Sequence, residues 1–166
     1  MPLVDIFILA LLYSIRLLSG GEATGYHVSP WLMAFAGFLF LNLAIIKRVA
    51  ELKIALNGGN QQISRRSYRT EDLLVIQTFG IASGFMSSLV LALYIQSYTA
   101  VTLYANPQAL WLIVPLILFW QCRFWLSTAR GNMHDDPIVY AVKDWVTWLV
   151  GIFIIFILLA ANIKIQ

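Results

Sequence analysis

The chain has 166 residues, of which 60% are hydrophobic and 11% are charged, and its net charge is +3. A typical soluble domain is about 25% charged and about 45–50% apolar, so this composition excludes an ordinary soluble domain and indicates an integral membrane protein. In such a protein an excess of Lys and Arg first reports orientation, and we expect no nucleic acid partner. The single cysteine excludes an intrachain disulfide and a CxxC metal site.

Five stretches approach the roughly 20 apolar residues that cross a hydrocarbon core. Together they predict an all-α integral membrane protein, with residues 1–166 forming a single membrane domain. The predicted spans cover about 4–20, 30–47, 72–96, 108–126 and 138–163. Charged residues interrupt the first stretch, which favours a retained span over a cleaved signal peptide.

Helix-start signals precede three of the spans. Pro30 opens the second span, and Thr70 is the expected N-cap of the third. The sequence "DDP" before the fifth span predicts Asp136 as the N-cap and Pro137 in the first turn.

The connections between spans alternate in charge. The connections GGEATGYHVS and SYTAVTLYANPQ contain no Lys or Arg, whereas the other two are basic. By the positive-inside rule we expect loops 48–71 and 127–137 to be cytoplasmic, with the N-terminus inside and the C-terminus outside. Aromatic residues near span ends are expected to be interfacial anchors, namely Trp31, Trp111, Trp120, Trp125, Tyr98 and Tyr104.

Two charged residues lie in the first span. Arg16 lies about two thirds along it and either snorkels to the outer interface or faces the bundle interior. Asp5 lies eleven residues earlier, on nearly the same helix face and about 16 Å away.

Basic residues gather after the second span. Lys47 and Glu51 have the i, i+4 spacing of an ion pair, and Arg48 lies one step around the helix. A basic strip follows, consisting of Arg65, Arg66, Tyr68 and Arg69. Guanidinium groups suit bidentate phosphate binding. The alternative is a positive-inside loop that touches anionic lipid.

The segment "RGNMHDDPIVYAVKD", residues 130–144, is unusually polar for this chain. Helical spacing from Asp136 carries Tyr140, Lys143 and Asp144 onto one face, with His134 and Asp135 just before the cap. Such a group can hold Mg²⁺, a phosphate or a sugar hydroxyl. It can also serve only for capping and interfacial pairing. We further expect its carboxylates and Lys143 to meet the basic strip.

Several segments resemble, in order, the second half of bacterial UbiA superfamily proteins, closest to the branch of decaprenyl-phosphate phosphoribosyltransferase. They are "VDIFILALLYSIRLLSGG", "FLNLAIIKRVAEL", "YRTEDLLVIQTFGIASG", "PLILFWQCRFWL" and "RGNMHDDPIVYAVKD". The resemblance implies five transmembrane helices like helices five to nine of a nine-helix intramembrane transferase. It also implies a bacterial inner membrane, a cytoplasmic-facing cleft and an isoprenoid substrate such as a polyprenyl phosphate.

The chain departs from that pattern at the family's metal site. Family enzymes bind magnesium diphosphate through an NDxxDxxxD motif in their first half, and this sequence contains no such motif. In place of the paired aspartates of the second family motif it has Lys47, Arg48 and Glu51. The resemblance assigns a set of residues to the cytoplasmic mouth: Asp5, Lys47, Arg48, Glu51, Arg66, Tyr68, Arg130, His134, Asp135, Asp136 and Lys143. Of these, Asp135 and Asp136 are the candidates for Mg²⁺.

Two functions are consistent with these features. The first is a polyprenyl-phosphate or prenyl transferase half that lacks the first Asp-rich motif and needs a separate N-terminal half. The second is a non-catalytic accessory subunit of a larger membrane complex. A small transporter is less favoured, because so few charges lie within the spans.

The charge pattern makes a direct prediction about topology. Residues 48–70 and 127–137 should face the cytoplasm, because Lys and Arg concentrate there. In oriented vesicles, the variant Ser64→Cys should react with an impermeant thiol reagent from the cytoplasmic side and Ser29→Cys should not. Cytoplasmic labelling of position 29 would overturn this topology.

Overall fold

A computed structural model describes residues 3–25, 28–57, 72–131, 133 and 136–162, and these are mainly helical and contain no strand. The elements are α1 (Val4–Thr24), α2 (Pro30–Asn57), α3 (Asp72–Gln96), α4 (Tyr98–Leu103), η1 (Pro107–Leu112), α5 (Ile113–Ala129), α6 (Pro137–Lys143) and α7 (Trp145–Asn162). η1 is a 3₁₀ turn that leads directly into α5.

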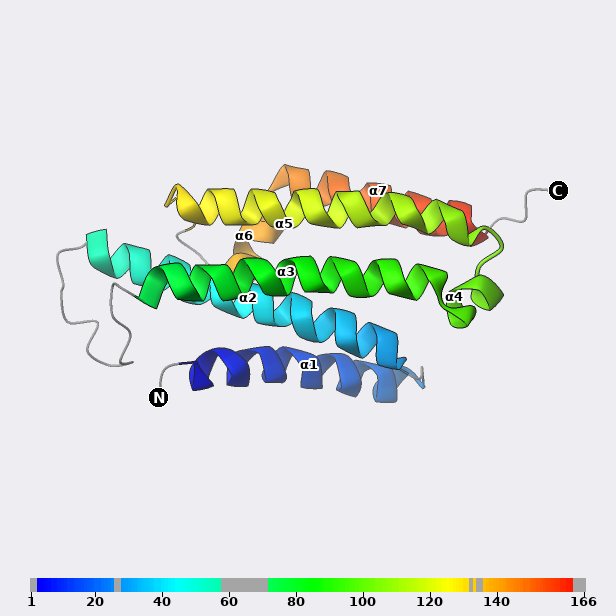
Figure 1. The fold of residues 1–166 in the computed structure, drawn as a ribbon, viewed down its shortest axis with the longest axis horizontal. Coiled ribbons are helices and arrows are strands. Elements are labelled where there is room, and N and C mark those ends of the chain that lie inside the picture. Colours follow the sequence, from blue (N-terminus) through cyan, green and yellow to red (C-terminus); the bar gives the residue numbers. More distant parts are fainter. Residues whose placement is uncertain (1–2, 26–27, 58–71, 132, 134–135, 163–166) are drawn as a thin grey trace.

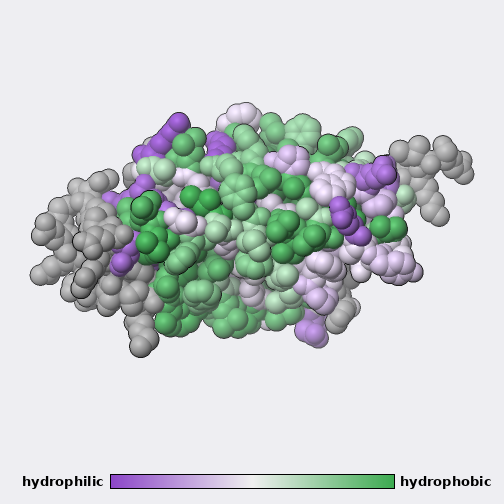
Figure 2. Space-filling model, viewed as in Figure 1, coloured by the Kyte–Doolittle hydropathy of each residue, from purple (hydrophilic) through white to green (hydrophobic). Residues whose placement is uncertain are grey.

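Five segments of these helices are long and apolar enough to cross a membrane. They cover residues 4–24, 30–54, 72–96, 107–129 and 145–162. Figure 2 shows the corresponding surface pattern, with hydrophobic side chains over the middle of the molecule and hydrophilic ones toward the two ends. This distribution is that of a multi-pass membrane protein.

The long helices form three tiers (Figure 1). α1 is the outermost helix on one side and packs against α2; α2 packs against α3, and α5 and α7 form the opposite tier. One apolar core lies among α1, α2 and α5, with Ile6, Ile46 and Phe124 fully buried. A second core, around Ile113 and Ile157, lies toward the other end of the bundle.

The central packing depends on small residues of α3. Gly80, Ser83, Gly84, Ser87 and Ser88 are all buried. Small side chains let membrane helices approach closely, which matters because lipid supplies no hydrophobic force between helices. At Gly80 an added Cβ would lie 2.7 Å from Cγ2 of Ile45 and still closer to the Trp125 ring, so this position has no room for a side chain.

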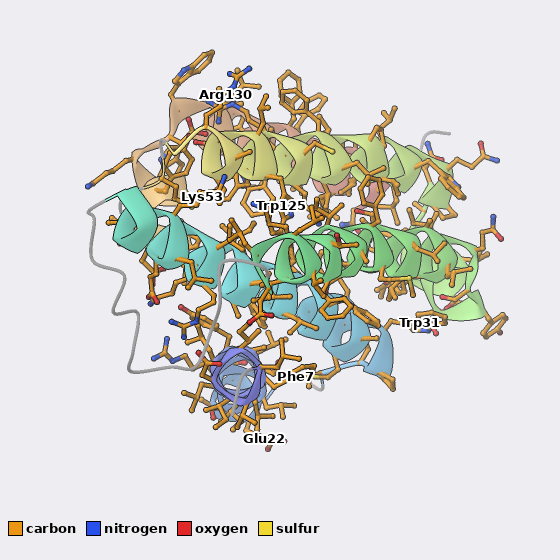
Figure 3. All side chains as sticks on the ribbon, turned by 60° about the vertical axis from the view of Figure 1, so that its left-hand side comes forward. Phe7, Glu22, Trp31, Lys53, Trp125 and Arg130 are labelled. Atoms are coloured by element: carbon orange, nitrogen blue, oxygen red, sulfur yellow. The ribbon has the colours of Figure 1, made fainter. Side chains whose placement is uncertain are left out.

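Hydrogen bonds cross the same interface. Trp125 Nε1 donates to Oδ1 of Asn42 at 2.9 Å, and Gln121 Nε2 donates to Oγ of Ser87 at 2.8 Å. Trp125 is 9% exposed and lies between α5 and the middle tier (Figure 3), so the expectation that it is an interfacial anchor is wrong. Its indole N–H finds an acceptor inside the protein because Asn42 is buried beside it.

α2 is longer than the predicted span. The helix continues past residue 47 to Asn57, so the first ten residues of the predicted loop 48–71 are helical. The buried side chains of Val49 and Leu52 pack this extension against the rest of the protein. Residues 58–71, including the predicted cap Thr70, lie outside the described part of the chain.

The predicted fifth span, 138–163, is two helices. Asp144, between α6 and α7, has an extended backbone with φ −88° and ψ 113°. Its carboxylate accepts hydrogen bonds from the backbone N–H of Thr147 at 3.0 Å and from its hydroxyl at 2.9 Å. Trp148 Nε1 donates to the Val142 carbonyl at 2.8 Å, which satisfies one of the last carbonyls of α6. These contacts stabilise the break by supplying partners for the interrupted backbone.

Two predicted helix starts agree with the structure. α2 begins at Pro30, and the Ser29 hydroxyl accepts the backbone N–H of Leu32 at 3.2 Å. α6 begins at Pro137, and Oδ1 of Asp136 accepts the backbone N–H of Ile138 at 3.0 Å.

The close contact at Gly80 predicts a packing defect on substitution. Gly80→Ala should destabilise the folded chain by about 1–3 kcal/mol, because overpacking forces backbone or rings to shift. Gly37→Ala is the matched control, since a Cβ at Gly37 meets nothing within 4 Å. Reversible unfolding in detergent micelles measures both. Equal stability of the two variants would contradict the packing described.

Candidate functional site

Most charged side chains of the described chain lie toward one end of the bundle, which we call the charged end. Here α1 begins, α2 and α5 end, and α6 crosses between them (Figure 1). Four helices therefore bring their charges together: Asp5 from α1, Lys47 and Arg48 from α2, Arg123 from α5, and Asp136 before α6.

Arg48 connects α1 to α2. Its guanidinium forms ion pairs with Asp5 on α1 and with Glu51 one turn later on α2. The residue is 8% exposed, and a charge this buried is tolerated only with charged partners. The planar fork of arginine suits two carboxylates at once. Arg48 therefore joins two helices and has its charge balanced within the protein.

Lys47 connects α2 to the start of α6 through an ion pair with Oδ2 of Asp136. Burial raises the pKa of Asp136, but the hydrogen bonds from the Lys47 ammonium and the Ile138 amide outweigh it, so the pKa lies below its ordinary value. The side chains of Lys47 and Asp136 are 33% and 26% exposed. Unlike the Arg48 cluster, this pair is open to exchange with an outside ion.

A third ion pair lies at the break between α6 and α7. Arg123 of α5 pairs with Asp144, whose carboxylate also caps α7 through Thr147. Burial raises the pKa of Asp144, while the Arg123 guanidinium and the two Thr147 hydrogen bonds lower it, and the net shift is downward. Trp120 Nε1 donates to the Thr147 hydroxyl at 3.0 Å, a second link between α5 and α7.

Hydrogen bonds to uncharged oxygens also connect α5 to α2 and α6. Lys53 projects from α2 toward the end of α5 (Figure 3), where its ammonium donates to the carbonyls of Thr128 at 3.2 Å and Ala129 at 2.8 Å. A cation is favourable there because it meets the negative end of the helix dipole. The Ser127 hydroxyl donates to the Tyr140 oxygen at 2.9 Å, which connects α5 to α6.

An apolar pocket of about 370 Å³ lies beside the Lys47–Asp136 pair. Its walls come from α2, α5, α6 and α7 and include Leu43, Trp120, Phe124 and Ile152. Leu43 lies one helical turn before Lys47. Pro137, which also lines the pocket, directly follows Asp136. The partly exposed Lys47–Asp136 pair and the apolar pocket are therefore linked through Leu43 and Pro137, an arrangement that fits an amphipathic ligand with an anionic head.

The structure brings together part of the predicted mouth. Asp5, Lys47, Arg48, Glu51 and Asp136 lie in the ion pairs above. The predicted pairing within α2 differs, because Glu51 pairs with Arg48 at i, i+3 while Lys47 turns to Asp136.

Of the remaining predicted residues, two are exposed at helix ends and the others lie outside the described residues. Arg130 is exposed at the end of α5 (Figure 3), and Lys143 is exposed at the end of α6. Four candidates lie outside the described residues: Arg66, Tyr68, His134 and Asp135. The basic strip also lies outside them, so its predicted contact with the carboxylates stays a prediction. The charged partner that the structure gives Asp136 is Lys47.

Sequence reasoning did not single out Arg123 as a site residue, and it gave Asp144 no partner. The predicted fifth span was continuous, so Asp144 was placed on one face of that helix and not at a break between two helices. The available signal was the position of Asp144 just before a strongly apolar run, with Thr147 three residues later, which is the spacing of an N-cap.

The predicted Mg²⁺ site stays a prediction, because Asp135, one of its two candidates, lies outside the described residues. Both oxygens of Asp136 already accept hydrogen bonds, one from Lys47 and one from the Ile138 amide. Among the residues that the structure describes, no group of three His, Cys, Asp or Glu side chains is arranged to hold a metal ion.

Comparison with known proteins places the chain among longer relatives. It is 34% identical over 154 residues to the uncharacterized protein y4nM of Sinorhizobium fredii, an alignment that covers 92% of the chain and 30% of that protein. It is 28% identical over 144 residues to the nodulation protein NoeC of Azorhizobium caulinodans, covering 85% of the chain and 46% of NoeC. The chain thus spans less than half the length of either relative. No protein-family model matches it, and no solved structure does.

The Lys47–Asp136 pair predicts coupled effects on stability. A double-mutant cycle with Lys47→Met and Asp136→Asn should give a coupling of about 1 kcal/mol, between the values of exposed and buried pairs. Because the folded-state pKa of Asp136 is depressed, the pair should stabilise fully above the ordinary value of 3.8 and lose its effect as the pH falls through the lower folded value.

Thermal unfolding of the four proteins in detergent at several pH values measures this coupling. Glu22→Gln, at the exposed far end of α1, is the control for removing a charge. Zero coupling at neutral pH would show that the two side chains are not paired.

Proposed function

We propose that this chain is the half of a UbiA-type polyprenyl-phosphate or prenyl transferase that carries the charged mouth of the cleft. The observation that carries this proposal is the Lys47–Asp136 pair beside an apolar pocket. Lys47 would hold a lipid phosphate, and the pocket would take the adjoining isoprenoid units. The proposal puts the charged end at the cytoplasmic face of a bacterial inner membrane, as the basic loops favour.

The ion pairs suggest which cation takes part in binding. Arg48 is buried and has two carboxylates, so its charge is already balanced. Among the described residues, Lys47 forms an ion pair with one carboxylate, and its side chain is 33% exposed. A phosphate carries more negative charge than a carboxylate, so an arriving lipid phosphate competes with Asp136 for the Lys47 ammonium. Asp136 then acts as the group that holds Lys47 in position before the ligand binds.

We infer that this half does not catalyse transfer alone. Reaction in this class breaks the bond between a diphosphate and an anomeric or allylic carbon, and the acceptor then bonds to that carbon. The leaving diphosphate needs stabilisation worth several kcal/mol. The sequence lacks the NDxxDxxxD motif, and no group of three His, Cys, Asp or Glu side chains among the described residues is arranged to hold a metal ion. A separate N-terminal half would supply that site, and the greater length of both relatives leaves room for one.

One observation favours a second candidate, a non-catalytic accessory subunit. Lys47, Arg48 and Arg123 are each paired with a carboxylate in the structure. Such pairs can serve only to join helices, since charges partly removed from water need partners. In that case the charged end would be a structural joint, and the apolar pocket would hold ordinary lipid.

Ligand binding separates the two candidates. Farnesyl phosphate should bind the purified chain more tightly than farnesol, and Lys47→Met should reduce that preference about tenfold, as expected for loss of a charge-assisted hydrogen bond. Lys53→Met is the matched control, because it removes a nearby cation that contacts only carbonyls in the described structure. Tryptophan fluorescence titration in micelles measures binding, since Trp120 and Trp148 line the pocket.

Equal affinity for farnesyl phosphate and farnesol would refute the lipid-phosphate site and favour the accessory role.

Activity measurements test the claim that a second half is needed. The purified chain in lipid vesicles should show no transfer from a polyprenyl phosphate or a prenyl diphosphate, with Mg²⁺ present, because the diphosphate site is missing. Metal-dependent turnover by the chain alone would contradict this.

A further inference from the structure

Arg16 stands apart from the ion pairs of the charged end. It is exposed on α1, twelve residues after the helix begins, which is about 18 Å along the axis of a 21-residue helix. Its guanidinium carbon lies 5.4 Å from the centroid of the Tyr13 ring. Among the described residues, the Tyr13 ring is the group that the Arg16 guanidinium contacts.

The ring contact sets the direction of the side chain. Tyr13 lies three residues earlier, so the Arg16 guanidinium leans back toward the start of α1 and toward the middle of the span. The Tyr13 ring in turn packs on Phe40 of α2, with centroids 5.6 Å apart. A side chain that snorkels to the nearer, outer interface would instead extend toward Thr24. Arg16 thus matches neither expected alternative: it is exposed and does not face the interior of the described bundle, and its contact with Tyr13 directs it away from the outer interface.

A guanidinium in this position needs an anionic partner. An arginine at the centre of a transmembrane helix costs about 2.5–3.5 kcal/mol on insertion scales, and a single ring contact offsets only part of that. Glu22, the other charged residue in the second half of α1, is six residues away, and this spacing points it to a different side of the helix.

We propose that Arg16 docks a transmembrane helix of a partner segment that carries a carboxylate at the same depth. This inference rests on the proposed need for a second half. α1 is the outermost helix on its side of the bundle (Figure 1), and Arg16 is exposed on it, so its guanidinium is accessible to such a helix. Both relatives continue beyond the aligned region for more than its length, so they contain the additional chain that could provide this segment.

Charge decides between this partner and a second copy of the same chain. Two copies related by a twofold axis along the membrane normal would place their Arg16 side chains at the same depth. An interface through this part of α1 would then bring two guanidinium groups together, which is unfavourable. A helix with a carboxylate gives an oppositely charged, hydrogen-bonded pair instead.

Synthetic helices of defined sequence test the proposal. The chain, carrying Cys122→Ala and a donor dye at Thr24→Cys, is reconstituted in phosphatidylcholine vesicles with an acceptor-labelled leucine-rich transmembrane peptide. One peptide has a central Asp and the other a central Leu. The Asp peptide should associate about tenfold more strongly by energy transfer, as expected for a charged pair in lipid.

Variants identify the residue responsible. Arg16→Leu should remove the preference for the Asp peptide, and Arg16→Lys should keep part of it. Arg130→Leu is the matched control, since it removes an exposed arginine at the charged end and should leave the preference unchanged. Equal association of the two peptides, or an unchanged preference in Arg16→Leu, overturns the proposal.

A further measurement tests the alternative that the anion beside Arg16 is a lipid headgroup and not a carboxylate of a partner helix. Phenylglyoxal added in water should not modify Arg16 in the folded chain, with or without phosphatidylglycerol in the vesicles. Rapid modification would place the guanidinium at the interface and refute a helix partner. None of these measurements uses a phosphorylated lipid or transfer activity, so failure of the transferase proposal would be seen separately in the farnesyl phosphate titration.

Discussion

Polar side chains of α2 hold this bundle together, because hydrocarbon chains supply no hydrophobic force that drives one apolar helix against another. Asn42 accepts the indole N–H of Trp125, Arg48 pairs with Asp5, and Lys47 pairs with Asp136. Each contact joins α2 to a different element, namely α5, α1 and the start of α6. Small residues of α3 then allow the close packing that brings α2 and α5 within reach of each other.

Because buried charges need partners, the cations that only join helices can be distinguished from those that can bind a ligand. A buried cation such as Arg48 is stable only while both its carboxylates stay in place, so an arriving ligand would have to disrupt the α1–α2 joint. The more exposed Lys47–Asp136 pair can open at lower cost, because water and a phosphate replace the lost contact. The proposed site therefore depends on unequal burial of two neighbouring cations, Lys47 and Arg48.

The break at Asp144, just before the last helix that could span a membrane, has a comparable role. At the break, Asp144 pairs with Arg123 of α5 and caps α7 through Thr147. The break turns α6 toward α2, which brings Asp136 to Lys47 and lets α6 form one wall of the apolar pocket. One extended residue thus determines both the third ion pair and the shape of the candidate site. Interrupted helices of this kind occur in membranes where the freed backbone groups find partners inside the protein.

The sequence by itself determined the membrane class, five apolar segments, and the helix starts at Pro30 and Pro137, because these depend on local composition and on residues adjacent to one another. It also identified α2 and residues 130–144 as the places where charge collects. Only the tertiary structure decided which charges meet, since Lys47 and Asp136 are 89 residues apart and helical spacing alone favoured Glu51. The buried position of Trp125 and the break at Asp144 were likewise decided by contacts with other helices, which an apolar sequence pattern does not encode.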